Sequence, residues 1–342
     1  MGMFDLSATT GVKESGKFLQ AGIIYNSGKG RNIMGVRKEA FKISSKVDNL
    51  TLYAIEVRPE VSMAVRGAVV IVHGMVEHKE RYLPFMEYLA SIGYGSIVYD
   101  QRGHGESVRK PEDLGYLYDH GETALVEDVQ LMVEEAKKRF PADPVHLFGH
   151  SMGSLIVRNY LAKYDDEIAT LTVSGCVSNN PAAGAGKAIA SLIGVFKGER
   201  HRSPFLTKMA FGSYNKAFGE VKSPNAWLNT DEKAVEAYDN DPLCGYMFTI
   251  NGNKALMQMI KMCYDPTQYE KKHLDIPVLF LSGADDPCCA GEKGFNDAVD
   301  FLKGVGYTNV SGVMLPGMRH EILNEPEHQK VYDLIAAHLA RA

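Results

Sequence analysis

The sequence contains little cysteine, with five residues in a chain of 342. The number is odd, and no two of them have the C-x-x-C spacing typical of zinc or redox sites. A scaffold held together by disulfides is therefore excluded, and we expect free thiols in a reducing compartment. The five residues are Cys176, Cys244, Cys263, Cys288 and Cys289.

The sequence also lacks a long apolar run and an excess of basic residues. No stretch reaches the about 18 apolar residues that indicate a membrane helix. The N-terminal residues do not form a signal peptide pattern, and Leu6 breaks the myristoylation pattern that would begin at Gly2. Acidic residues outnumber basic ones by 42 to 37, which gives a net charge of −5 and disfavours nucleic-acid binding. We expect a cytoplasmic protein without stable membrane insertion. Nothing in the sequence indicates an oligomeric state.

Strand-like and helix-like segments alternate from about residue 41 onward. The first two strand-like runs flank Asp48 and Asn49 and predict a hairpin. Six further apolar runs, such as AVVIVHG and IPVLFLSG, alternate with amphipathic helical segments. This order predicts an α/β fold with a mostly parallel eight-stranded sheet and helices on both faces. Residues 41–178 and 271–342 would form this core, while residues 1–40 would be a loose N-terminal extension or an N-terminal lid.

The alternation breaks between residues 179 and 270, where we expect a helical lid inserted into the core. Three segments have helical patterns: Ala182–Phe196, Thr207–Phe218 and Lys254–Cys263. They are rich in aliphatic residues and Met, and such surfaces adapt to flexible chains. Two interpretations remain open, since these side chains would either line an acyl-chain pocket or pack the lid onto the core.

The segment Gly149–Gly153, GHSMG, matches the pattern G-x-S-x-G. A buried strand, VHLF, precedes it and a helix follows it, which is the context that a nucleophile elbow requires. Such a turn exposes the Ser hydroxyl above the edge of the sheet, and the N-terminus of the following helix favours negative charge there. The sequence therefore predicts Ser151 as a nucleophile.

A nucleophilic Ser needs a base and an acid that orients the base, and in this architecture they follow the Ser in the order acid, then His. His320 follows the last strand-like run, at the edge of the sheet where α/β proteins place their chemistry. The acid should follow the run VLFL, where Asp285 and Asp286 stand side by side. We favour Asp286 because Pro287 after it fixes the loop, and Asp285 remains the alternative.

Two backbone N–H groups should form an oxyanion hole. The residue after the nucleophile, Met152, would supply one of them. The other would come from the loop after the third strand, where Met75 follows His73 and Gly74. Only the backbone of these methionines is used, so their side chains are free to vary.

Taken together, the motifs VHGMVEH, YDQRGHGES, GHSMGS, SGADDP and PGMRHEILNE resemble the α/β-hydrolase superfamily, and in particular its branch of monoacylglycerol lipases, lysophospholipases and serine aminopeptidases. The resemblance covers residues 40–340. It implies Ser151, Asp286 and His320 as the triad, Met75 and Met152 as oxyanion donors, and a lid between the sixth strand and the strand of the acid. It also implies structural roles for Arg102, His104 and Ser107, and no metal or organic cofactor.

The expected function is hydrolysis of a lipid or other small ester, by a monoacylglycerol lipase or lysophospholipase type of carboxylesterase that contacts lipid surfaces transiently. One alternative is an esterase for short-chain or aryl esters. Another is an amidase or aminopeptidase, which would need an acidic lid residue to bind the substrate amine, with Glu199, Glu220 and Asp231 as candidates. A non-catalytic small-molecule receptor is disfavoured by the complete triad. A dehalogenase-like enzyme is disfavoured because that branch has Asp at the elbow.

Two thiols, Cys288 and Cys289, lie next to the expected acid. Free Cys is commonly buried, so packing in the loop is the favoured interpretation. The alternative is that one thiol reaches the active site.

Overall fold

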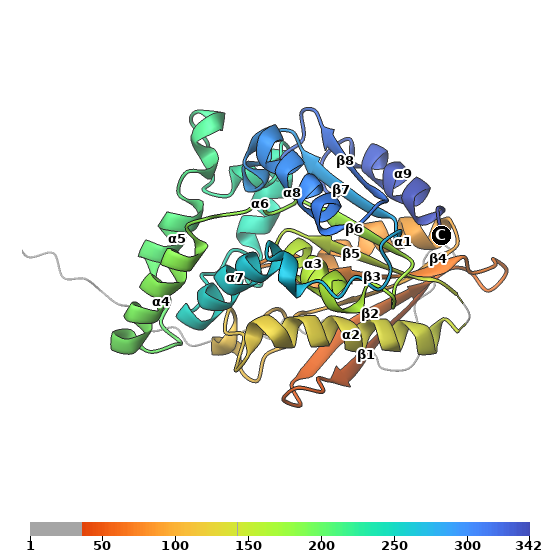
Figure 1. Ribbon diagram of the computed structural model, residues 1–342, viewed down its shortest axis with the longest axis horizontal. Coiled ribbons are helices and arrows are strands. Elements are labelled where there is room, and N and C mark those ends of the chain that lie inside the picture. Colours follow the sequence, from red (N-terminus) through yellow and green to blue (C-terminus); the bar gives the residue numbers. More distant parts are fainter. Residues whose placement is uncertain (1–35, 142) are drawn as a thin grey trace, which may run out of the picture.

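The computed structural model describes residues 36–141 and 143–342 (Figure 1). Eight strands form one sheet in the order β1-β2-β4-β3-β5-β6-β7-β8. The pairs β1–β2 and β2–β4 are antiparallel, and all other neighbours are parallel. The predicted mostly parallel eight-stranded sheet is thus confirmed. Its strands are β1 Arg37–Ser44, β2 Thr51–Arg58, β3 Gly67–Val72, β4 Tyr94–Tyr99, β5 Val145–His150, β6 Thr170–Ser174, β7 Val278–Gly283 and β8 Val310–Leu315.

Helices cover both faces of the sheet because successive side chains of a strand point to opposite sides. In β3, Val70 and Val72 belong to one apolar cluster, which includes side chains of α2, α3 and α8. Val69 and Ile71 belong to another, which includes side chains of α1 and α9. The central strands therefore consist of continuous apolar residues. The helices are α1 Leu83–Ser91, α2 Gly121–Arg139, α3 Met152–Tyr164, α8 Gly291–Val305 and α9 His328–Leu339.

The hairpin expected around Asp48 and Asn49 joins β1 to β2, with Asn49 in the left-handed region at a φ of 58°. Strand β1 begins at Arg37, four residues inside the stretch expected to be an extension. Arg37–Ala40 is ordered there because it pairs with Ile55–Arg58 across the hairpin. Residues 1–35 of the expected extension lie outside the described residues.

The chain between β6 and β7 contains helices and, in the part that the structure describes, no strand beyond an isolated bridge between Arg202 and Thr249. Helix α7 packs against α4 and α3 and so joins this insertion to the core. Figure 1 shows α4 and α5 at the end of the molecule farthest from the sheet. The helices are α4 Ala183–Lys197, α5 Pro204–Phe211, α6 Glu232–Asn240 and α7 Ile250–Cys263.

These helices differ in detail from the three expected segments. The segment Thr207–Phe218 is not one helix, because α5 ends before Gly212 and a separate 3₁₀ helix, Tyr214–Phe218, follows. Helix α7 begins four residues earlier than expected, where the Thr249 side chain accepts a hydrogen bond from the N–H of Gly252. Helix α6 has no counterpart among the expected segments. It is mostly polar and buries only Val235 and Tyr238, which gives a weak apolar pattern.

Across residues 36–141 and 143–342, no helix combines the length and the apolar character needed to cross a membrane. All five cysteines are free, as their number and spacing suggested, and all five are buried.

Candidate active site

Ser151 occupies a strained turn between β5 and α3. Its φ of 55° and ψ of −118° are unfavourable for a residue with a side chain. Its N–H donates to the carbonyl of Ser174 on β6 at 2.9 Å, and its carbonyl accepts from the N–H of Ser154 at 2.8 Å. A Cβ at Gly153 would lie 2.1 Å from the carbonyl oxygen of Val72, so only glycine lets α3 begin this close to the end of β3. The turn leaves Ser151 partly exposed at the N-terminus of α3.

Asp286 and His320 form a buried pair. Nδ1 of His320 lies 2.8 Å from Oδ2 of Asp286, and each residue is 2% exposed. The other carboxylate oxygen, Oδ1, accepts from the N–H of Cys288 at 2.8 Å, so both oxygens are held. Asp285, the alternative acid, is exposed, and its N–H donates to the carbonyl of Met318. The geometry therefore selects Asp286 as the partner of the imidazole.

The second ring nitrogen of His320 faces a thiol. Its Nε2 lies 3.9 Å from Sγ of Cys288, and among the described residues no hydrogen bond joins it to Ser151. The ring packs between His150 and Trp227, with centroid distances of 4.6 and 4.9 Å. Catalytic hydrogen bonds are often long or misaligned before substrate binds. For Nε2 to take a proton from Ser151, the imidazole or the Ser151 side chain must therefore move from the position seen here.

Two neighbouring imidazoles have opposite protonation behaviour. Burial disfavours the charged form of His320, but the Asp286 carboxylate outweighs burial and raises its pKa well above the ordinary value. At His150, burial, helped by His320, outweighs the opposing effect of the carboxylates Glu77 and Glu321 and lowers the pKa to about 3. His150 is therefore a neutral ring that packs against His320. Of the two imidazoles, His320 is the one that binds a proton, because Asp286 stabilises its charged form.

The loop after β3 approaches the Ser151 turn closely. A Cβ at Gly74 would lie only 3.2 Å from Cβ of Ser151. Met75 follows at once, and among the described residues neither its N–H nor that of Met152 donates to another protein group. Of the two amides predicted for an oxyanion hole, one thus directly follows Ser151 in the chain, and the other belongs to the loop that approaches Ser151. Their unused donors are available to a ligand.

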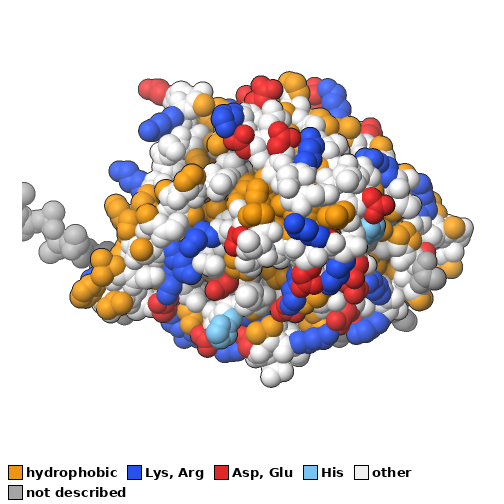
Figure 2. All heavy atoms as spheres, viewed as in Figure 1, with side chains coloured by type: hydrophobic (Ala, Val, Ile, Leu, Met, Phe, Trp, Pro, Cys, Tyr) orange, Lys and Arg blue, Asp and Glu red, His pale blue; other side chains and the backbone are white. Residues whose placement is uncertain are grey.

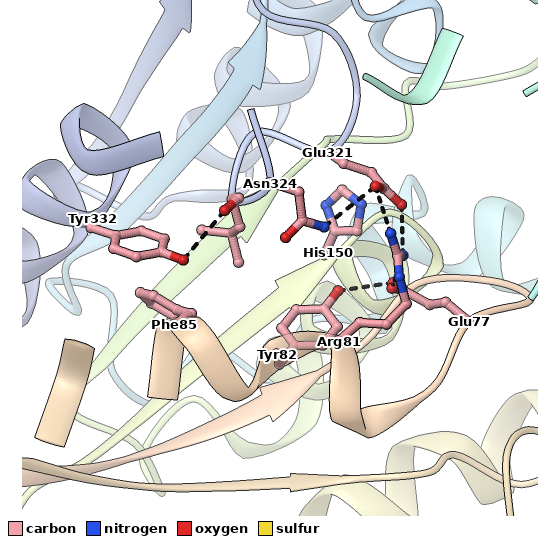
Figure 3. A pocket seen from close by; sticks show the side chains of 9 residues that line it. Glu77, Arg81, Tyr82, Phe85, His150, Glu321, Asn324 and Tyr332 are labelled. Atoms are coloured by element: carbon pink, nitrogen blue, oxygen red, sulfur yellow. Dashed lines mark hydrogen bonds and ion pairs between the residues drawn. The ribbon is translucent and has the colours of Figure 1, made fainter. Parts of the chain in front are cut away.

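A network of charged side chains, Glu77, Arg81 and Glu321, stabilises the loop after β3. Oε1 of Glu77 accepts from the N–H of Gly74 and, at 2.9 Å, from the hydroxyl of Tyr82. Arg81 donates to Oε2 of Glu77 at 2.6 Å and to both oxygens of Glu321 at 2.6 and 2.7 Å (Figure 3). Glu77 and Glu321 are 4% and 5% exposed. Because Glu321 follows His320 directly, the network connects the loop of Met75 with the loop of His320.

The sequence patterns do not single out this network. Arg81 and Glu321 are 240 positions apart, and only the fold brings them together. The available signal was local: Glu77 and Arg81 stand four residues apart in a segment that begins at the end of a buried strand, and Glu321 adjoins the expected base. Burial of Glu321 would raise its pKa, but Arg81 reverses this and lowers it. Glu321 is therefore ionised within the network.

Aromatic side chains of the insertion cover His320. Trp227, the only tryptophan of the chain, packs edge-on against Tyr214 with a centroid distance of 4.9 Å and also stacks with Phe211. Trp227, Cys244 and Cys288 belong to one apolar cluster between the insertion and the loop after β7. The sequence left two interpretations for Cys288, packing in the loop or a thiol that reaches the active site. The structure combines them, because the thiol is buried in this cluster and also lies next to His320.

The acidic residues considered for an aminopeptidase have other contacts or point elsewhere. Glu199 pairs with Lys254 at 2.8 Å. Asp231 caps α6 by accepting from the N–H of Lys233, and Glu220 is exposed. None of the three has a contact with Ser151 or His320 among the described residues.

The loop after β4 is tied beneath the site. Arg102 is fully buried and donates to Asp128 at 2.8 Å and to Ser45 at 3.1 Å. Oγ of Ser107 accepts from the N–H of Tyr53 at 3.0 Å. His104 donates from its ring to the carbonyl of Arg102 and packs edge-on against His73. These contacts support the loop and do not reach Ser151.

The fold and the site together define a class of protein. Four features have the arrangement of the α/β-hydrolases. They are a mostly parallel eight-stranded sheet, a strained Ser after β5, a helical insertion after β6, and an Asp–His pair whose members follow β7 and β8. Residues 63–327 match the family model described as serine aminopeptidase, S33. The chain belongs to this family of α/β-hydrolases, which confirms the resemblance found in the motifs.

Relatives include lipases and esterases. A monoacylglycerol lipase of Mycolicibacterium smegmatis is 30% identical over 272 residues, which cover 78% of this chain and 86% of that protein. A phospholipase of Bacillus subtilis is 25% identical over 78% of this chain and 92% of its own. Among solved structures, a thermostable carboxyl esterase from Bacillus coagulans superposes with a TM-score of 0.80 and 25% identity, covering 88% of this chain and 99% of that one.

Proposed function

We propose that this protein is a serine hydrolase that cleaves carboxylic esters of single-chain lipids, such as monoacylglycerols or lysophospholipids. The observation that carries the proposal is the buried Asp286–His320 pair at 2.8 Å, together with a Ser151 in strained backbone geometry at the end of β5. Such strain is typical of functional sites. No metal or organic cofactor is required by this chemistry.

In the proposed mechanism, Nε2 of His320 takes the proton of the Ser151 hydroxyl while Oγ attacks the ester carbonyl. The N–H groups of Met75 and Met152 donate to the resulting oxyanion, an interaction commonly worth about 3 kcal/mol per donor. Asp286 keeps the imidazole in the required tautomer and stabilises its charged form. The alcohol leaves with the proton from His320. Water then releases the acid from Ser151 with the same base.

The insertion supports a lipid substrate. Large apolar side chains of α4 and α5 are exposed, among them Leu192 at 62%, Val195 at 79%, Phe196 at 78% and Phe205 at 60%. Figure 2 shows apolar side chains gathered at this end of the molecule. Contiguous exposed apolar patches are typical of interaction sites. We assign residues 179–270 the role of a lid whose outer face touches lipid surfaces transiently, in a protein of the cytoplasm.

Two relatives favour the same substrate class, since they are named as a monoacylglycerol lipase and a phospholipase. The family name favours an aminopeptidase, but the acidic lid residues Glu199 and Asp231 are already engaged in other contacts. A receptor would have no use for a strained Ser beside an Asp–His pair. Ester hydrolysis therefore has more support than either alternative.

The test is an activity panel of monoacylglycerols, lysophospholipids, short aryl esters and aminoacyl amides at matched concentrations. We expect the highest kcat/KM for a single-chain lipid ester and none for the amides. A preference for aminoacyl amides would overturn the proposal, and a preference for short aryl esters would restrict it to an esterase without lipid specificity.

A further inference from the structure

Three side chains that could bind a metal ion meet where the loop after β3 contacts the insertion. His78 lies just beyond Met75, while Asp241 and Cys244 lie between α6 and α7. One nitrogen, oxygen or sulfur atom from each lies within 4.8 Å of the others. We propose that His78, Asp241 and Cys244 bind one divalent cation of the zinc type, which fastens the insertion to the loop of Met75.

The donor set suits zinc. An imidazole nitrogen, a thiolate and a carboxylate oxygen are its usual protein ligands. Three protein ligands leave a fourth position for water, and the Asp241 side chain is 32% exposed, so solvent reaches this side of the site. Nε2 of His78 and Oδ2 of Asp241 are 2.9 Å apart. Zinc bonds of about 2.0–2.3 Å place tetrahedral ligands roughly 3.3–3.8 Å apart. This pair must therefore open by a few tenths of an ångström to admit the ion, and the thiol, which lies within 4.8 Å of both atoms, must close on it.

The ligand atoms are already oriented by their neighbours. Oε2 of Glu80 lies 2.7 Å from Nδ1 of His78, which fixes Nε2 as the nitrogen facing Asp241. A carboxylate on the far nitrogen is the usual support of a metal-binding His. Oδ1 of Asp241 accepts from the N–H of Leu243 at 2.8 Å, which leaves Oδ2 for the ion. The N–H of Cys244 donates to the carbonyl of Asp241 at 3.0 Å and sets the position of the thiol.

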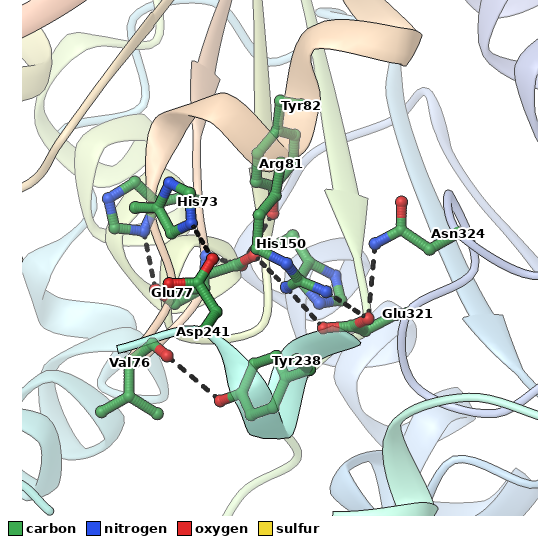
Figure 4. Close-up of polar contacts among 12 residues, drawn as sticks. His73, Val76, Glu77, Arg81, Tyr82, His150, Tyr238, Asp241, Glu321 and Asn324 are labelled. Atoms are coloured by element: carbon green, nitrogen blue, oxygen red, sulfur yellow. Dashed lines mark hydrogen bonds and ion pairs between the residues drawn. The ribbon is translucent and has the colours of Figure 1, made fainter. Parts of the chain in front are cut away.

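The same place is a contact between the core and the insertion. The carbonyl of Val76 accepts from the N–H of Gly245 at 3.0 Å and from the hydroxyl of Tyr238 at 3.1 Å (Figure 4). Val76 follows Met75 directly, so an ion bound next to it would fix both the insertion and the loop that carries Met75. His320 also has a carboxylate and a thiol beside it, but that group belongs to the hydrolytic site.

Binding must displace protons. The ion replaces the proton between Nε2 of His78 and Oδ2 of Asp241, and it replaces the thiol proton of Cys244. The proton on Nδ1 stays with Glu80. Binding therefore releases two protons, and the affinity must increase with pH.

The test uses Co²⁺ as a spectroscopic probe, added to the full-length metal-free protein. We expect one equivalent to bind with a thiolate-to-cobalt charge-transfer band, and one equivalent of Zn²⁺ to remove the band. The band should disappear in Cys244→Ala and weaken in Asp241→Asn, and it should persist in Cys288→Ala and Ser151→Ala. Absence of the band in the unaltered protein, or its persistence in Cys244→Ala, would overturn the proposal.

A second measurement needs no substitution, so it holds even if a variant fails to fold. Zn²⁺ should slow alkylation of Cys244 by iodoacetamide at least tenfold, as read by peptide mass spectrometry, and leave Cys288 unaffected. Equal rates with and without Zn²⁺ would contradict the site. Because the Ser151→Ala variant should bind the metal normally, failure of the metal site and failure of the proposed hydrolase are distinguishable.

Discussion

The Sγ atom of Cys288 lies 3.9 Å from Nε2 of His320, and both side chains are buried. Nε2 is the atom that must take the proton of Ser151 in the proposed mechanism. Burial raises the pKa of Cys288 despite the nearby His320, so the thiol is neutral near pH 7. Cys288 is therefore a neighbour of the base and not a second nucleophile.

Blocking this thiol should inhibit the enzyme. We expect prolonged incubation with a small reagent such as methyl methanethiosulfonate to reduce ester turnover severalfold or more. The reagent converts the thiol to a methyl disulfide with release of methanesulfinate, and the added methylthio group on Cys288 would occupy the space beside Nε2. The Cys288→Ala variant should keep its turnover and resist the reagent. Cys289→Ala is the matched control and should remain sensitive, and inhibition of Cys288→Ala equal to that of the unaltered protein would refute this explanation.

The Asp286–His320 pair predicts the pH dependence of the reaction. The neutral imidazole is the base, and Asp286 raises the pKa of His320 above its ordinary value of 6.5. The acidic limb of kcat/KM should therefore have its midpoint above pH 6.5, with activity lost as the pH falls through it.

Asp286→Asn should move that midpoint to lower pH, because burial would then dominate, as it does at His150. The same change should lower kcat roughly 10⁴-fold through loss of the correct tautomer. Asp285→Asn is the control and should change neither value. An unshifted midpoint in Asp286→Asn would show that another group controls the limb.

The ion network behind the Met75 loop should contribute strongly to stability. Arg81→Met would leave the buried carboxylates Glu77 and Glu321 without their partner, and breaking such a pair costs about 3–5 kcal/mol. Chemical denaturation at pH 7 measures this loss. Arg37→Met is the matched control, because Arg37 is exposed and forms an ion pair with the exposed Glu39, and it should cost less than about 1 kcal/mol.

The sign of the pH effect follows from Glu321, whose pKa is lowered by Arg81. In the unaltered protein its contribution to stability is present above the unfolded pKa and is lost as the pH falls through the folded pKa. In Arg81→Met burial raises the pKa of Glu321, so protonation relieves the cost at acidic pH. The stability difference between the two proteins should therefore begin to shrink above pH 4.5, the ordinary carboxyl pKa, and continue to shrink as the pH falls below it. A difference that is independent of pH would contradict this assignment.

The sequence predicts the strands and the three proposed catalytic residues, but not the contacts between the loops that surround them. Strand positions follow from continuous β-branched runs, and Ser151, Asp286 and His320 follow from their places at the ends of three strands, because local patterns encode both. The contacts of His320 with Cys288 and Trp227, and of Arg81 with Glu321, depend on how the loops pack across the sheet. Helix α6 is too polar to be predicted from an apolar pattern, because it buries only Val235 and Tyr238. Its position depends on a tertiary contact, the hydrogen bond from the Tyr238 hydroxyl to the carbonyl of Val76.

The exposed apolar side chains of α4 lead us to predict that turnover of a lipid substrate in vesicles depends on contact of this helix with the vesicle surface. Replacing both Val195 and Phe196 with Asp should lower turnover of a monoacylglycerol presented in vesicles at least fivefold, and leave turnover of soluble p-nitrophenyl acetate unchanged. Val61→Asp is the control, because Val61 is fully exposed on the loop between β2 and β3, away from the insertion. Equal losses on both substrates would indicate damage to the fold and not to surface contact.

The central claim is that Ser151 is the nucleophile, and covalent labelling tests it most directly. Incubation with a fluorophosphonate followed by peptide mass spectrometry should show one adduct per chain, on Ser151. The Ser151→Ala variant should not react and should lose ester turnover while it keeps its fold by circular dichroism. An adduct on another residue, or turnover in Ser151→Ala equal to that of the unaltered protein, would contradict the account.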